Sequence, residues 1–258
     1  MKIHVDPYVN RKTGVLINKG NFTSQEELEK MEAEFTGFRM RQLTKEPVKG
    51  EFDFEHLCKI HERIFGDVYE WAGCPRIIHI EKEEPALGGL STQYSEPENI
   101  KRDADKVLGE MNAIKWDKLS LDEKASAFSK SMAELWKVHP FREGNTRTTV
   151  TFCCDFAESK GFGIDRELFK NNSEYVRRAM VAYTAKFEDL GDVSQPEHLH
   201  RIVKDGIQRW EKANQKQEER FGMSEWRNVV DRTSGGISTT GFNRQRENTI
   251  ETIESEKE

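Results

Sequence analysis

Residues 139–147 read His-Pro-Phe-Arg-Glu-Gly-Asn-Thr-Arg, and this stretch decides the fold of the chain. Apolar residues recur at helical spacing on both sides of it, so we expect it to join two helices. Its last residues would then lie at a helix N-terminus, where main-chain N–H groups without a helical partner attract anions. The sequence therefore predicts an anion-binding turn between two helices.

Three residues of this turn suit a phosphate group. Gly144 allows the main chain to approach a ligand closely, and Arg147 brings a planar guanidinium that matches phosphate. The amide of Asn145 either binds a phosphate oxygen or braces the loop. Together the three residues predict a phosphate cradle.

Two further residues of the turn supply a metal ligand and a base. Glu143 offers the hard carboxylate oxygen that Mg²⁺ takes together with substrate phosphates, which indicates a metal–nucleotide rather than bare phosphate. His139 has an ordinary pKa of about 6.5, so it can accept a proton from a hydroxyl at neutral pH. We interpret His139 as the general base.

The rest of the chain is predicted to be mainly α-helical. Ser24 with Glu27, and Ser120 with Glu123, form capping boxes that mark two helix starts. Helical periodicity is expected over residues 24–43, 52–65, 98–114, 120–138, 148–159, 174–187 and 198–220. Residues 76–94 differ, because β-branched residues followed by turn residues predict a β-hairpin there.

The organisation follows from these elements. We expect one catalytic domain with appendages, divided into an N-terminal extension (1–23), the domain itself (24–190), a C-terminal helical extension (191–222) and a polar, partly disordered tail (223–258). The apolar stripe Phe128, Met132, Leu135, Phe152 and Phe156 is interpreted as core.

Composition narrows the classes of partner and the compartment. A net charge of −6 argues against a nucleic-acid partner, which usually calls for a basic surface. The four cysteines form no Cys-x-x-Cys pair, and no window approaches the roughly 18 apolar residues of a membrane span. We expect a cytoplasmic protein. Residues His56, His61 and His79 lie near Cys58 and Cys74, but their spacing matches no structural zinc site.

The turn resembles the signature of the Fic family, H-x-F-x-[DE]-G-N-[GK]-R-x-x-R, and matches its first nine positions except one. The segment from Ile64 to Gly73, followed by Arg76, is similar to the part of the family that precedes a target-docking flap. The resemblance implies a Fic fold, a helical bundle with a short β-hairpin flap. It also implies a protein adenylyltransferase, which transfers AMP from ATP with Mg²⁺ onto a Ser, Thr or Tyr hydroxyl of a target protein.

Roles carry over from the family residue by residue. His139 would be the base, Phe141 the anchor of the loop in the core and Glu143 the Mg²⁺ ligand. The nucleotide would be held by Gly144, Asn145, Thr146 and Arg147. The target would add as a strand to the flap, residues 76–94, which begins with Arg76, Ile77, Ile78, His79 and Ile80.

Two positions depart from the family pattern. Thr146 stands where the family has Gly or Lys, which either narrows the cradle or selects an ordinary helical backbone, and we favour the second. Val150 stands where a second arginine contacts the terminal phosphate, which removes a contact worth about 1.5 to 3 kcal/mol. Transfer from another nucleotide or a phosphocholine donor is therefore an alternative, and a catalytically weak nucleotide- or target-binding module is another.

Control by an internal helix of pattern [ST]-x-x-x-E-[GN] is not predicted. Glu98-Asn99 is preceded by Tyr94 and Glu247-Asn248 by Asn243, so neither segment matches. In the family the inhibitory glutamate pairs with the arginine that is missing here, so control by a separate small antitoxin-like protein, or no such control, is expected instead. The target would be a cytoplasmic protein, with translocation into a host as the alternative.

Overall fold

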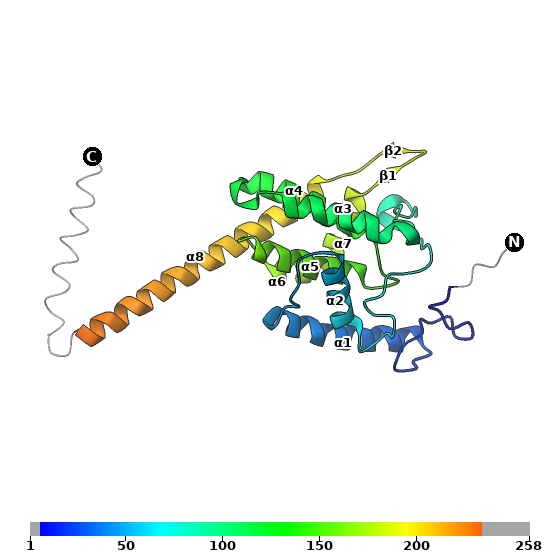
Figure 1. Ribbon diagram of the computed structural model, residues 1–258, viewed down its shortest axis with the longest axis horizontal. Helices are drawn as coiled ribbons and strands as arrows, with labels where there is room; N and C mark the ends of the chain where they lie inside the picture. The colour runs from blue at the N-terminus through cyan, green and yellow to red at the C-terminus, as the bar shows by residue number, and fades with distance from the viewer. Residues whose placement is uncertain (1–5, 234–258) are drawn as a thin grey trace. The chain divides into compact units, whose positions relative to one another are not determined.

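A computed structural model describes residues 6–233 of the chain (Figure 1). These residues contain eight α-helices and one small sheet. The helices are α1 (Gln25–Lys45), α2 (Phe54–Phe65), α3 (Ile100–Ala113), α4 (Leu121–Val138), α5 (Asn145–Ser159), α6 (Arg166–Asn171), α7 (Ser173–Tyr183) and α8 (Glu197–Thr233). The chain divides into two units, residues 1–211 and 212–258, and of the second the structure describes the last part of α8.

Helix starts follow the capping residues. The hydroxyl of Ser24 accepts the N–H of Glu27 ahead of α1, and Ser120 with Glu123 forms a complete capping box ahead of α4, as predicted. α5 begins three residues earlier than the expected residue 148, because its N-cap is Gly144. The turn therefore runs into the helix without a break.

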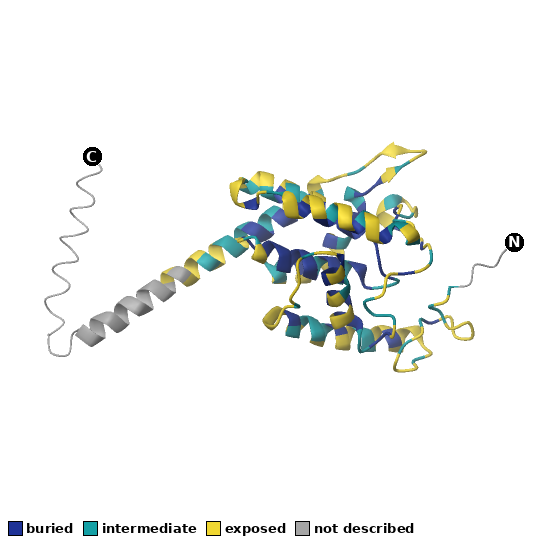
Figure 2. Cartoon of the chain, in the orientation of Figure 1, coloured by how far each residue is buried: buried dark blue, intermediate teal, exposed yellow. Residues whose placement is uncertain are grey.

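The core of the first unit is built around α5. This helix packs against α4 on one side and α2 on the other, while α3 covers α4 and α1 covers α2 (Figure 1). The faces that meet are buried along their length (Figure 2). Burial of each large apolar side chain contributes about 1.5 to 3 kcal/mol. The apolar stripe predicted as core is fully buried: Phe128, Met132, Leu135, Phe152 and Phe156.

The prediction of a β-hairpin over residues 76–94 is wrong. This stretch contains a single 3₁₀ turn, η1 (Pro85–Leu87), which continues into a turn at Gly88 and Gly89, and it contains no strand. The small antiparallel sheet lies after α7, where β1 (Lys186–Phe187) pairs with β2 (Gly191–Asp192). The mainly α fold with a short hairpin is confirmed, but the hairpin lies where a helix end and a linker were expected.

The first two main-chain N–H groups of the flap, residues 76–94, donate to residues outside the flap. The N–H of Arg76 donates to the carbonyl of Pro140 (2.8 Å). The next N–H, that of Ile77, donates to the hydroxyl of Tyr8 (3.1 Å). The β-branched residues therefore predicted an extended chain correctly, but not its partner.

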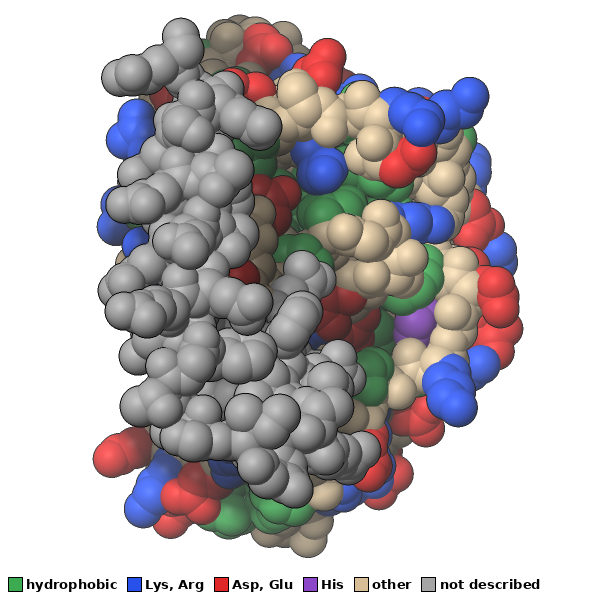
Figure 3. All heavy atoms as spheres, turned by 90° about the vertical axis from the view of Figure 1, so that its left-hand side faces the viewer, with side chains coloured by type: hydrophobic (Ala, Val, Ile, Leu, Met, Phe, Trp, Pro, Cys, Tyr) green, Lys and Arg blue, Asp and Glu red, His purple; other side chains and the backbone are tan. Residues whose placement is uncertain are grey.

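The C-terminal part of the chain is more helical than expected. α8 continues to Thr233, so residues 223–233 of the predicted polar tail are helical, and residues 234–258 lie outside the described range. On the face drawn in Figure 3, acidic and basic side chains are interspersed around the described surface. Among residues 6–233, no helix combines the length and the apolar character that a membrane span requires.

Candidate active site

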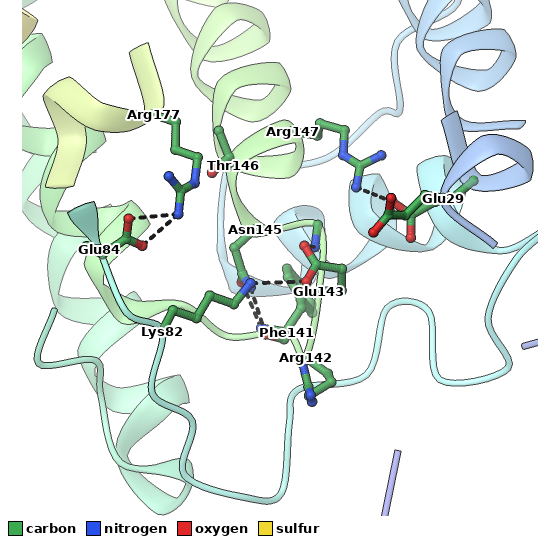
Figure 4. Close-up of polar contacts among 12 residues, drawn as sticks. Glu29, Lys82, Glu84, Phe141, Arg142, Glu143, Asn145, Thr146, Arg147 and Arg177 are labelled. Atoms are coloured by element: carbon green, nitrogen blue, oxygen red, sulfur yellow. Dashed lines mark hydrogen bonds and ion pairs between the residues drawn. The ribbon is translucent and has the colours of Figure 1, made fainter. Parts of the chain in front are cut away.

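The turn between α4 and α5 forms the floor of a cavity of about 190 Å³. Its walls include the predicted base, metal ligand and cradle residues together with three residues from elsewhere. The lining consists of Lys82, Trp136, His139, Glu143, Gly144, Asn145, Thr146, Arg147 and Arg177. The close-up in Figure 4 shows how most of these side chains lie.

His139 ends α4 in a left-handed conformation (φ 50°), which costs a non-glycine residue about 1 to 2 kcal/mol. Its side chain is 3% exposed, stacks on Tyr94 with ring centres 3.9 Å apart, and meets Trp136 edge-on at 5.3 Å. Among the described residues, neither ring nitrogen has a hydrogen-bond partner. An unpaired, buried imidazole in a strained position points to function rather than to packing.

The environment of His139 keeps its imidazole neutral. Burial, followed by the nearby positive charges of Lys82 and Arg76, lowers its pKa well below the usual value. At pH 7 the ring is therefore in the form that accepts a proton, as a general base requires.

Asn145 braces the loop, which is one of its two predicted uses. Its side-chain amide donates to the carbonyl of Phe141 (2.7 Å) and its oxygen accepts the N–H of the same residue (2.9 Å). Both ends of the amide are thus used inside the turn. Phe141 is buried and stacks on His61 at 3.8 Å, as expected of a core anchor.

Gly144 is required by the protein itself. Its φ of +82° is left-handed, and a Cβ added there would lie 2.2 Å from Cζ of Phe65. The close approach that was predicted for a ligand is therefore an approach to an aromatic ring of α2.

Glu143 is held from both sides. One carboxylate oxygen accepts the N–H of Gly144 (3.0 Å) and the other accepts Nζ of Lys82 (3.0 Å). Burial would raise the pKa of this carboxyl, but Lys82 and the Gly144 N–H outweigh it and the pKa is lowered. Glu143 is therefore ionised, with Lys82 as its cationic partner.

His61 supports the turn from α2 and was missed by sequence reasoning. Its Nδ1 accepts the N–H of Gly73 (2.8 Å), so Nε2 carries the proton and donates to the carbonyl of Glu143 (3.0 Å). Burial lowers the pKa of His61 to about 3. The sequence feature that could have identified His61 is its place on the buried face of α2. Among the described residues, no group of three or more His, Cys, Asp or Glu side chains is placed to hold a metal ion.

Thr146 and Arg147 begin α5. Thr146 has a helical backbone, as favoured, and its hydroxyl oxygen accepts Nε1 of Trp136 (2.9 Å). The guanidinium of Arg147 donates to Glu32 (2.5 Å) and to Thr36 (3.1 Å), both on α1. Arg147 lines the cavity, but its terminal nitrogens are turned toward α1, away from Arg177 (Figure 4).

Arg76 is a buried clamp rather than a surface residue of the flap. Its guanidinium donates to the carbonyls of His139 (2.8 Å) and Ile78 (2.7 Å), and also to that of Ser95. Burial lowers its pKa. The clamp joins both ends of the flap to the residue predicted as the base.

The rest of the flap alternates between protein and solvent, as an extended chain does. The side chains turned toward the protein are those of Arg76, Ile78, Ile80, Lys82 and Glu84, and those turned outward are Ile77, His79, Glu81 and Glu83. None of the predicted flap residues 76–80 lines the cavity, whereas Lys82 does. Continuing the alternation beyond Ile80 would have found Lys82 and Glu84.

Arg177 is the other contribution that the sequence did not reveal. It reaches the cavity from α7, and its Nη2 lies 2.7 and 2.8 Å from the two carboxylate oxygens of Glu84 (Figure 4). No local pattern on α7 distinguishes it from the neighbouring Arg178. Only the folded structure shows that Arg177 belongs to the site.

The chain is similar to one family of known proteins. The model of the Fic/DOC family matches residues 51–157. Protein adenylyltransferase VbhT of Bartonella schoenbuchensis is 33% identical over 178 residues, which cover 69% of this chain and 36% of VbhT. Probable protein adenylyltransferase y4lH of Sinorhizobium fredii is 35% identical over 164 residues, which cover 62% of this chain and 79% of y4lH.

Solved structures share the fold. The N-terminal FIC domain of Bep8, a VirB-translocated effector of a Bartonella species, superimposes with a TM-score of 0.63 at 22% identity, over 78% of this chain and 94% of that domain. BepC of Bartonella tribocorum, solved with bound AMPPNP, gives 0.63 at 20% identity, over 77% of this chain and 95% of the other.

Proposed function

The chain belongs to the Fic/DOC family, and on that premise we propose that it is a protein adenylyltransferase, which transfers AMP from ATP onto a Ser, Thr or Tyr hydroxyl of a target protein. The observation that carries the proposal is the geometry of His139. Its neutral imidazole, with both nitrogens unpaired among the described residues, lines the same cavity as Glu143 and the first turn of α5.

In this reaction the hydroxyl oxygen of the target attacks the α-phosphorus of ATP, and the hydroxyl proton moves to a ring nitrogen of His139. The bond from the α-phosphorus to its bridging oxygen breaks, and pyrophosphate leaves. The first-turn N–H groups of α5 have no partner inside the helix and bind phosphate oxygens. The hydroxyl of Thr146 still has its proton to donate, because its oxygen accepts from Trp136.

Magnesium fits this site by the chemistry of its donor. Mg²⁺ is usually held by one or two carboxylates together with substrate phosphates, and Glu143 is an ionised carboxylate at the cavity. Lys82 donates to one carboxylate oxygen of Glu143 and would have to release that oxygen before Mg²⁺ could bind to it. The bound ion would neutralise charge that develops on the phosphates.

The target docks on the flap as an added strand. Within residues 6–233, the main-chain N–H groups of residues 78–81 make no hydrogen bond, and the outward side chains Ile77 and His79 are presented beside them. An extended peptide can pair with such an edge while its side chains vary. Inhibition would come from a separate small protein, and the cytoplasm of the producing cell or of a host would supply the target.

The proposal is tested by incubating the protein with labelled ATP, Mg²⁺ and cell lysate. We expect a labelled protein band that depends on His139, with the His139→Ala rate lower by about 10² to 10⁴-fold. Equal labelling by wild type and His139→Ala would refute the role of the base. Absence of labelling under all conditions, with nucleotide still bound, would support the alternative of a binding module.

One observation favours a second candidate function. Val150 replaces the family's second arginine, so the donor is another nucleotide or a phosphocholine carrier in this alternative. The mass added to a purified target distinguishes these donors from AMP.

A further inference from the structure

The signature turn leaves the cavity short of positive charge for a triphosphate. Val150 has no charge and packs against the core, while the terminal nitrogens of Arg147 are engaged by Glu32 and Thr36. A nucleoside triphosphate is strongly anionic, and charge-assisted contacts to phosphate are among the strongest hydrogen bonds. Two other cations, Lys82 and Arg177, line the same cavity.

Arg177 has the position and the chemistry of a phosphate ligand. In Figure 4 it lies to the left of Thr146, whereas Arg147 lies to the right. The planar guanidinium that it turns toward the cavity already binds a two-oxygen anion, the carboxylate of Glu84. Only Nη2 makes these contacts, so within the described residues Nη1 and Nε remain to bind phosphate oxygens, and the guanidinium fork matches phosphate as it matches carboxylate.

Glu84 is an unusual partner for it. This carboxylate is 1% exposed, and it lies on the flap where the N–H of Glu84 donates to the carbonyl of Leu90 (3.1 Å) and its carbonyl accepts the N–H of Gly89 (3.0 Å). The turn that these bonds close packs through η1 on α7. A buried carboxylate requires a compensating charge, and Arg177 supplies it.

The two inward side chains at this end of the flap therefore form a complementary pair. Lys82 places a cation on Glu143, and Glu84 places an anion on Arg177. A magnesium nucleotide would bring the same charges in the same arrangement, a cation to Glu143 and phosphate oxygens to the guanidinium. Because the flap holds these positions, nucleotide and flap compete for them.

We propose that Arg177 binds the terminal phosphates of the nucleotide, in place of the arginine missing at Val150, and that Glu84 occupies Arg177 as an internal anion until the nucleotide displaces it. This inference rests on the proposed function only in requiring that the cavity binds a nucleoside triphosphate. It makes the flap a brake on nucleotide binding as well as a docking segment.

The test is calorimetric titration of the full chain with Mg-ATP and with AMP, without any target protein. Every protein carries His139→Ala, which prevents turnover. In this background we compare Arg177→Ala, Glu84→Gln and a matched control, Arg178→Ala, which changes an exposed arginine next along α7 that does not line the cavity. Thermal unfolding of each variant verifies the fold.

Arg177→Ala is expected to weaken Mg-ATP binding about tenfold or more while AMP binding stays within about twofold, because AMP has no terminal phosphates. Glu84→Gln is expected to tighten Mg-ATP binding about tenfold, since it removes the competing charge but keeps the side-chain shape. Arg178→Ala is expected to bind both nucleotides as the parent does.

Unchanged Mg-ATP affinity in a folded Arg177→Ala protein would overturn the proposal. So would equal losses for ATP and AMP, or a Glu84→Gln protein that binds Mg-ATP no more tightly than the parent. If Arg177→Ala does not fold, Glu84→Gln decides alone. If the wild-type chain labels no target in the labelling experiment but the binding pattern holds, the proposed transferase activity is refuted and this inference stands. If the wild type labels a target but the binding pattern is absent, this inference is refuted and the transferase activity stands.

Discussion

At the scale of single residues, the cradle is shaped mainly by contacts within the protein. Asn145 spends both ends of its amide on Phe141, and Gly144 is required by the ring of Phe65. The first-turn N–H groups of α5 and the hydroxyl of Thr146 remain to bind phosphate, beside Arg177 in the same cavity. Residues of a signature can be indispensable because they hold the turn, without touching the ligand.

Gly144→Ala should lower the free energy of unfolding by more than the left-handed backbone conformation alone would explain. The left-handed conformation costs about 1 to 2 kcal/mol, and the contact with Phe65 adds about 1 to 3 kcal/mol. Urea unfolding measures the loss. The matched control is Gly161→Ala, which has the same φ of +82° but no atom within 4 Å of the added Cβ. An equal loss of unfolding free energy in the two variants would show that the ring of Phe65 moves aside without cost.

His61 predicts a pH dependence of stability. The unfolded chain takes up this proton near its usual pKa of about 6.5, whereas the folded chain does so at about 3. The unfolded state therefore binds protons first as the pH falls, so this stability is complete above about pH 6.5 and is lost below it. From pH 7.5 to 5.5 we expect the free energy of unfolding to fall by about 1.4 kcal/mol from His61.

The measurement is urea unfolding at both pH values for wild type and His61→Gln, which keeps a donor for the carbonyl of Glu143. The variant should lose part of the pH dependence and retain the part that His139 contributes in the same direction. An identical pH dependence in both proteins would contradict the assignment.

At the scale of elements, the flap links target docking, the base and the nucleotide. The N–H of Arg76 donates to the carbonyl of Pro140, and the Arg76 guanidinium donates to the carbonyl of His139. Further along the flap, Lys82 contacts Glu143 and Glu84 contacts Arg177. Any displacement of this segment by a target or a nucleotide would change several parts of the cavity together. An extended chain without a ladder can move in this way, because fewer main-chain bonds hold it.

Arg76→Lys should slow transfer while leaving nucleotide affinity nearly unchanged. A lysine keeps the charge but cannot donate in the three directions that the guanidinium covers, so the turn at His139 loses its support. A displacement of a catalytic group by about 1 Å can cost about 10²-fold in rate. The kcat of labelling and the Kd for ATP are compared with those of Ile77→Ala.

Ile77 is the control because it is 72% exposed on the same segment and touches the cavity at no point. Its substitution should affect the KM for the target rather than kcat. Loss of ATP affinity in Arg76→Lys equal to its loss in kcat would show that the clamp supports the whole cavity rather than His139.

At the scale of the whole molecule, the buried core of the described residues lies in residues 15–207, within the first unit. A chain ending at residue 211 should therefore retain the free energy of unfolding and the ATP affinity of the full chain to within about 0.5 kcal/mol. Urea unfolding and calorimetry of the two forms test this. A loss above 2 kcal/mol would mean that residues 212–258 contribute to the fold.

What the sequence by itself determined was local. Capping boxes placed the starts of α1 and α4, helical periodicity placed the core stripe, and the spacing of His139, Glu143 and Arg147 identified the family. These signals arise from groups a few residues apart, whose relation is set by the chain itself. The β-branched residues of the flap likewise predicted extended chain. Predicting a hairpin also required a partner strand, which the local sequence pattern does not specify.

The tertiary structure alone decided which charges meet. Lys82 and Glu143 are 61 residues apart, and Glu84 and Arg177 are 93 apart. No periodicity joins residues at such separations, because their contact depends on how α7, the flap and the turn pack together. The sequence therefore revealed a turn that can handle phosphate, and the packing of the chain revealed which side chains occupy it.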